Sequence, residues 1–199
     1  MSGRTARRSV LVALAAGLAG CSGLGGLGDS GSSPTPAPDN PAVGDVEAQG
    51  TLRLTSPAFD DGGPIPEAYG RDAENVNPPL SIAGVPAGAA TLTLIVDDPD
   101  AVEPAGQVWL HWLVWNVPAS RTEIPEGWEP ESAVEGRNDF GRRGYGGPDP
   151  PDGRHTYRFK LYALDATLDL PASASKTEVG AAMEGSILAA TQLTGTYAP

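Results

Sequence analysis

The sequence predicts a mainly β protein, built as an antiparallel β-sandwich of two sheets with one C-terminal α-helix. Three segments, 91–98, 108–117 and 156–164, are rich in β-branched and aromatic residues, and stretches dense in Gly and Pro separate them. Only 175–190 shows the spacing of an amphipathic helix. Strands that outnumber a single terminal helix are typical of a sandwich.

The shorter strands follow from local patterns. Two leucines alternate with polar residues in 52–55, which predicts a first strand. A short strand is expected at 80–82 and another at 193–197. The passage 118–154 contains many Gly and Pro residues and is expected to be mostly loop.

The C-terminal helix is predicted from its start signal and its apolar spacing. Ser175 and Glu178 match a capping box, in which each side chain bonds to the other residue's backbone N–H. Apolar residues then recur at helical spacing at Val179, Met183, Ile187 and Ala190.

Residues 1–20 have the pattern of an export signal. Arg4, Arg7 and Arg8 precede an apolar run at 10–19, which is too short for a stable membrane span. The paired arginines resemble a twin-arginine signal. The run ends at the lipobox-like Leu-Ala-Gly-Cys21, which predicts cleavage before Cys21 and lipidation of its thiol. The alternative is an ordinary signal peptide with an incidental cysteine.

The remaining chain divides into a tether and a domain. Residues 21–45 are mostly Gly, Ser, Pro and Ala and are expected to form a disordered tether, followed by a folded domain at 46–199. Loss of the signal would change the formal net charge from −12 to −15, which argues against nucleic acid as a partner. Such an acidic, lysine-poor composition also favours a halophilic source. The predicted location is the outer face of the cell membrane.

Three polar side chains interrupt apolar strand faces. Alternation places Asp98 on the face of Leu92, Leu94 and Val96. It places His111 on a face with Trp109, Leu113 and Trp115, and His155 in register with the apolar face of the third strand. Because buried polar groups need partners, Asp98, His111 and His155 are expected to meet in one cluster, joined by Asp100. The alternative is three separately hydrogen-bonded core residues.

Four segments together resemble the phosphatidylethanolamine-binding proteins, also called Raf-kinase-inhibitor-like proteins, in their bacterial and archaeal branch. The segments occur in the family's order within about 50–197: Asp98-Pro99-Asp100-Ala101, Trp109-Leu110-His111-Trp112, Tyr145 to Gly153, and His155-Thr156-Tyr157-Arg158-Phe159. The resemblance implies two antiparallel sheets in a Greek-key arrangement, with a small pocket at one end that accepts anions and phosphorylated head groups.

The resemblance also implies which residues form the pocket. These are Asp98, Asp100, Trp109, His111, Gly147, Pro150, His155 and Tyr157. We expect both histidines to donate to an oxyanion, with the aspartates raising their pKa values, Tyr157 adding a donor, and Gly147 admitting the ligand to the backbone. Asp149 departs from the family pattern, and an ionised carboxylate there would repel an anion.

Three other classes of function are alternatives to ligand binding. A hydrolase needs an activated nucleophile, but the only cysteine lies in the signal and no Gly-x-Ser-x-Gly motif occurs, so no catalytic residue and no cofactor are predicted. Two histidines and an aspartate can ligate zinc, but the close ligand spacings of zinc motifs are missing, so no metal is predicted. A protein-interaction or protease-inhibitor module rests on family analogy alone.

Overall fold

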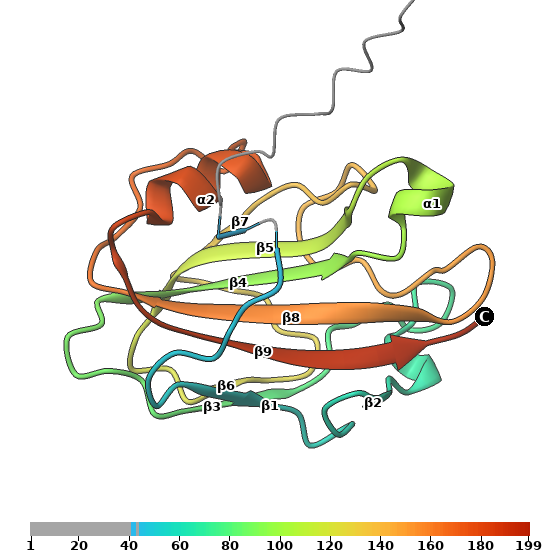
Figure 1. Ribbon diagram of the computed structural model, residues 1–199, viewed down its shortest axis with the longest axis horizontal. Coiled ribbons are helices and arrows are strands. Elements are labelled where there is room, and N and C mark those ends of the chain that lie inside the picture. The colour runs from blue at the N-terminus through green and yellow to red at the C-terminus, as the bar shows by residue number, and fades with distance from the viewer. Residues whose placement is uncertain (1–40, 43) are drawn as a thin grey trace, which may run out of the picture. The chain divides into compact units, whose positions relative to one another are not determined.

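The computed structural model describes residues 41, 42 and 44–199. The predicted signal, Cys21 and the first twenty residues of the predicted tether lie outside this described part. The described residues form two sheets. The larger consists, in spatial order, of β2 (Gly63–Pro64), β9 (Ile187–Tyr197), β8 (His155–Leu164), β4 (Thr91–Asp98), β5 (Trp109–Pro118) and β7 (Val134–Glu135) (Figure 1).

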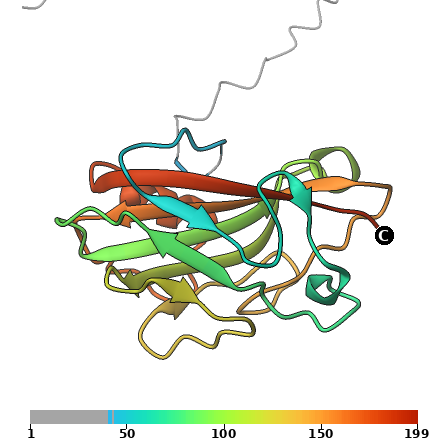
Figure 2. The same ribbon diagram turned by 90° about the horizontal axis from the view of Figure 1, so that it is seen from below.

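The smaller sheet lies across one face of the larger one, as Figure 2 shows. It has the order β1 (Arg53–Thr55), β3 (Leu80–Ala83) and β6 (Glu123–Ile124). Neighbouring strands are antiparallel in both sheets, except for the two-residue parallel pairing of β2 with β9. The predicted class, a mainly β sandwich with a helix, is therefore confirmed.

The larger sheet is buried on both faces, which explains why every residue of β4 is buried. One face packs on the smaller sheet through residues such as Leu92, Leu94 and Val96. The other face packs under α2 (Lys176–Met183) through residues such as Ile95. A strand covered on both sides reads as an almost continuous apolar run, as 91–98 does.

The predicted capping box at Ser175 and Glu178 is present, but the helix is shorter than predicted. It ends at Met183, and Gly185 adopts φ +80°, a left-handed conformation that breaks the helix. Ile187 and Ala190, predicted in the helix, belong instead to β9. The 187–190 segment pairs with β8, and this long-range pairing overrides the local helical spacing.

The passages expected to be irregular contain several short elements. They are β2, β6, β7, the 3-10 helix η1 (Glu67–Tyr69) and α1 (Val102–Ala105), a single turn after β4. Each has two to four residues, which is too short for a periodic pattern to show. No helix in the described part of the chain has the length and apolar character needed to cross a membrane.

The end of the predicted tether packs on the domain. Residues 41, 42 and 44–46, here called the N-terminal strap, lie against the face of the larger sheet that carries α2. The Lys160 ammonium donates to the carbonyl oxygens of Ala42 (2.8 Å) and Gly44 (3.3 Å), and Ala42 is fully buried. The folded part thus begins before the predicted boundary at 46. The strap docks mainly through backbone oxygens, which side-chain composition does not reveal.

Candidate functional site

A β-bulge near the start of β5 sets the position of His111. Val96 pairs with Trp112 and the next residue, Asp97, pairs with Leu110, so His111 is an extra residue opposite β4. The bulge shifts the alternation of β5. His111 therefore does not share a face with Leu113, which packs under α2, and the predicted parity was wrong there. His111 instead contacts the ring of Tyr157, with centroids 5.1 Å apart.

Asp98 and His155 form a buried pair at the ends of β4 and β8. His155 Nδ1 lies 2.7 Å from Asp98 Oδ2, and its Nε2 lies 2.8 Å from Asp152 Oδ1. Burial opposes a charge on His155, but the two carboxylates outweigh it and raise the pKa of the imidazole. Both ring nitrogens of His155 are thus hydrogen-bonded to carboxylates. Asp152 is a partner that the sequence did not indicate.

His111 is buried, and its pKa is shifted in the opposite direction from that of His155. Burial lowers its pKa, although the Gly146 carbonyl and Asp98 act in the other direction, so the predicted rise is wrong for this histidine. Its Nδ1 lies 2.7 Å from the Gly146 carbonyl oxygen, which only accepts, so Nδ1 carries the hydrogen. The neutral ring therefore presents Nε2 as an acceptor, not as a second donor.

A cavity of about 290 Å³ opens beside these groups. Of the predicted site residues, Asp98, Trp109 and His111 line it. The remaining walls come from residues that the sequence did not single out as site residues, on α1, on 138–151 and near η1: Arg71, Ala101, Pro104, Ala105, Phe140, Asp149 and Pro151. Phe140 packs edge-on against Trp109 and His111, with centroids 5.4 and 5.3 Å away. The cavity thus combines an aromatic wall with ionisable groups.

Arg71 supplies the positive charge at the mouth of this cavity. Its guanidinium lies 4.1 Å from the centroid of the Phe140 ring, a cation–π contact, and donates to Asp149 at 2.8 Å. Asp149, expected to repel an anion, is thus paired with a cation. Both side chains are about two-fifths exposed, so this pair exchanges readily with solvent ions.

Three of the predicted residues support the cavity without lining it. A Cβ on Gly147 would lie 2.3 Å from the Tyr69 carbonyl oxygen, so this glycine permits close packing on the chain beside Arg71, and it does not line the cavity. Pro150 is buried, and Pro151 lines the cavity in its place. Asp100 accepts from the backbone N–H of Thr156 at 2.7 Å and contacts neither histidine ring.

Two buried donors beside the cavity have no hydrogen-bond partner among the described residues: the Trp109 indole N–H and the Tyr157 hydroxyl. Burial raises the pKa of Tyr157, and the nearby carboxylate of Asp98 adds to the effect. The hydroxyl therefore stays protonated and able to donate.

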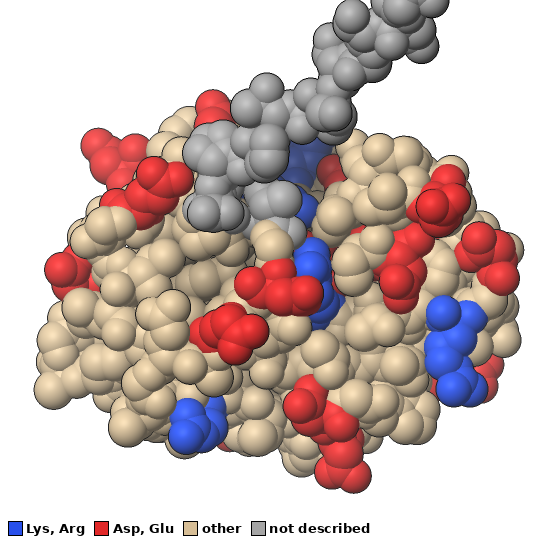
Figure 3. Space-filling view, viewed as in Figure 1, with Lys and Arg blue, Asp and Glu red and all other residues tan. Residues whose placement is uncertain are grey.

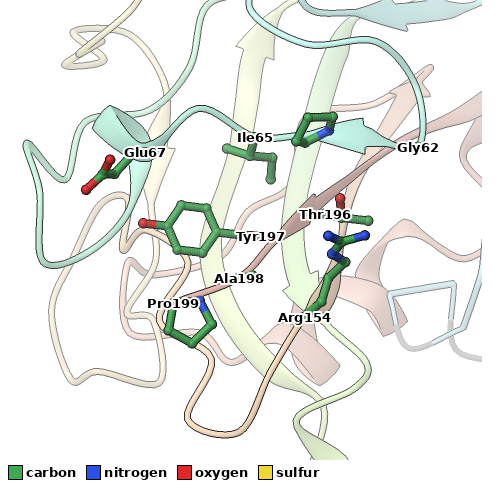
Figure 4. Close-up of a pocket in the computed structure, with 9 residues that line it drawn as sticks. Gly62, Ile65, Glu67, Arg154, Thr196, Tyr197, Ala198 and Pro199 are labelled. Atoms are coloured by element: carbon green, nitrogen blue, oxygen red, sulfur yellow. The ribbon is translucent and has the colours of Figure 1, made fainter.

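A larger cavity of about 500 Å³ lies by the end of β9. Figure 4 shows Glu67 and Arg154 on opposite sides of it, with Tyr197 between them. Neither histidine lines it, and its charged side chains do not converge. The smaller cavity is therefore the better candidate site. In the part of the chain that the structure covers, no three His, Cys, Asp or Glu residues are grouped to hold a metal ion.

Comparisons with known proteins identify the family and support the fold. The family model described as phosphatidylethanolamine-binding protein matches residues 55–198. A UPF0098 protein from Methanothermobacter thermautotrophicus is 48% identical over 151 residues, which cover 73% of this chain and 98% of the relative.

Two solved structures are also similar. A putative phosphatidylethanolamine-binding protein homologue from Chlamydia trachomatis superposes with a TM-score of 0.70 at 41% identity, covering 75% of this chain and 98% of that one. Escherichia coli YbcL superposes with a TM-score of 0.68 at 33% identity, covering 74% and 98%. The chain therefore belongs to the phosphatidylethanolamine-binding protein family.

Proposed function

We propose that the chain binds a small ligand carrying an oxyanion, such as a phosphorylated head group, in the cavity lined by Asp98, Trp109 and His111. The observation that carries this proposal is the Arg71 guanidinium at the cavity mouth, held over the Phe140 ring. An oxyanion can replace Asp149 on this exposed guanidinium, because bidentate pairing with phosphate or carboxylate suits its geometry.

The deeper groups would then orient the ligand. Tyr157 and Trp109 have buried donors without partners, and such groups gain free energy when a ligand or water supplies an acceptor. The Asp98 carboxylate does not itself attract an anion. Its oxygens already accept hydrogen bonds from Asp100 N, Ala101 N and His155. It serves to hold His155 and the turn that leads into α1.

Binding, and not catalysis, is the activity that we propose. Among the described residues that line the cavity, none is a Ser, Thr, Cys or Lys that could act as a nucleophile. The ring of His155, the other base, is occupied at both nitrogens.

The test is a titration followed by NMR of the two histidine rings. Phosphate, acetate, phosphoethanolamine and zinc are added separately to the wild type and to Arg71→Gln. We expect the oxyanions to shift His111 saturably in the wild type, with affinity about tenfold weaker or more in Arg71→Gln, because this variant lacks the guanidinium that pairs with the oxyanion. Arg53→Gln removes an exposed arginine from β1 as the matched control and should bind as the wild type does. A response to zinc alone would replace this proposal with a metal site.

We further propose that the protein acts outside the cytoplasm, anchored by a lipid on Cys21. The support is the Arg7-Arg8 pair, the apolar run and the cysteine in lipobox context. We expect Cys21→Ser to move the protein from the membrane fraction to the soluble extracytoplasmic fraction. Recovery of both variants in the cytoplasm would refute the anchoring and the location together.

A further inference from the structure

Both lysines of the chain lie in one place, on the opposite face of β4 from the cavity. Asp98 points toward the cavity, and its neighbour Asp97 points to the other face of the sheet. Asp97 is fully buried and accepts from Arg158 Nε (2.8 Å), Lys160 Nζ (2.8 Å) and Lys176 Nζ (3.4 Å). Arg158, Lys160 and Lys176, gathered around Asp97, are here called the basic seat.

The three cations of the basic seat all pair with the same carboxylate, that of Asp97 on β4, in a protein whose formal net charge is −12. Burial lowers the pKa of Lys160 to about 8, against the opposing effect of Asp97. This direction is expected for a cation whose partners do not fully offset its loss of hydration.

The N-terminal strap contacts the basic seat through oxygen atoms. Lys160 donates to the carbonyls of Ala42 and Gly44, and Tyr162 donates to the carbonyl of Pro41. Arg158 pairs with Asp45 at 3.1 Å, although the Asp45 side chain is 76% exposed. The strap therefore presents to the seat several carbonyl oxygens and one carboxylate.

We propose that the basic seat is an oxyanion-binding site that the chain's own strap occupies. A tetrahedral oxyanion of the phosphate or sulfate type has the acceptor oxygens that the strap supplies, and as a dianion it carries more negative charge than the single Asp45 carboxylate of the strap. Figure 3 shows Lys and Arg side chains gathered at the centre of this face, bordered by Asp and Glu. Binding of the anion displaces the strap from Lys160, and so frees the chain that leads to the N-terminal region.

The experiment uses the full-length protein with sodium sulfate as the probe and sodium chloride at equal ionic strength as the reference. Hydrogen–deuterium exchange is followed at the Val46 amide, which donates to Gln192 in the docked strap. We expect sulfate, but not chloride, to speed this exchange saturably. Equal responses to the two salts would overturn the proposal.

Matched variants distinguish competition between sulfate and the strap from a general effect of the protein's charge. Tyr162→Phe removes a strap contact but no seat cation, so sulfate affinity should rise roughly threefold to tenfold, the range for one lost hydrogen bond. Lys176→Gln removes a seat cation and should weaken sulfate binding. Arg53→Gln removes one charge from β1 on the other sheet and should leave the strap response unchanged. An equal loss in Arg53→Gln and Lys176→Gln would contradict a local site.

The cavity and the basic seat can be told apart in the same sample. Sulfate in the cavity is reported by the His111 ring and is weakened by Arg71→Gln. The strap response should survive in Arg71→Gln, and its disappearance there would contradict a second site.

Discussion

Asp97→Asn is expected to lower the free energy of unfolding by about 3–5 kcal/mol, the usual cost of removing one partner from a buried ion pair. The change leaves Lys160, which is fully buried, without its carboxylate. The cations then repel one another in a region with little water. Urea denaturation measures this loss as a lower midpoint concentration, with the same dependence of the unfolding free energy on urea in both proteins.

Two controls make this prediction specific. Asp169→Asn makes the same chemical change at an exposed position and should alter stability by less than about 0.5 kcal/mol. Asp97→Asn combined with Lys160→Met should lose less than the sum of the two single changes, because the buried charge and its partner disappear together. Additive losses would mean that Asp97 and Lys160 do not stabilise each other.

Oxyanion binding in the cavity is expected to take up a proton at His111. Burial lowers the pKa of His111, so the ring is neutral at pH 7 in the free protein and Nε2 accepts. A bound anion favours the charged ring and raises its pKa. Between the free and bound pKa values, affinity should therefore fall by about tenfold for each unit of rising pH.

Calorimetric titration with sulfate between pH 5 and pH 8 measures this linkage, because sulfate does not titrate in that range. His111→Asn keeps a donor for the Gly146 carbonyl but cannot take up the proton, so its affinity should be nearly independent of pH. His155 has a raised pKa and both nitrogens bonded, so it should contribute little. A flat profile in the wild type would show that the anion does not contact His111.

From the sequence, Asp98, His111 and His155 are predicted to meet at one end of the sandwich, and the structure brings them together. The predicted parity of His111 is wrong, because a β-bulge inserts this residue. The pKa values of the two histidines shift in opposite directions because burial dominates at His111, whereas the carboxylates of Asp98 and Asp152 outweigh burial at His155.

Local patterns alone predicted the long strands, the capping box at Ser175 and the family. Strand periodicity, capping chemistry and ordered motifs all depend on residues that are neighbours in the sequence. Only the tertiary structure decided that Arg71 stands at the cavity mouth, that 187–190 is strand, and that backbone carbonyls of the strap cover Lys160. All three have the same physical reason. Each depends on contact between segments that are remote in sequence, and such contacts either override local propensity or cannot be predicted from it.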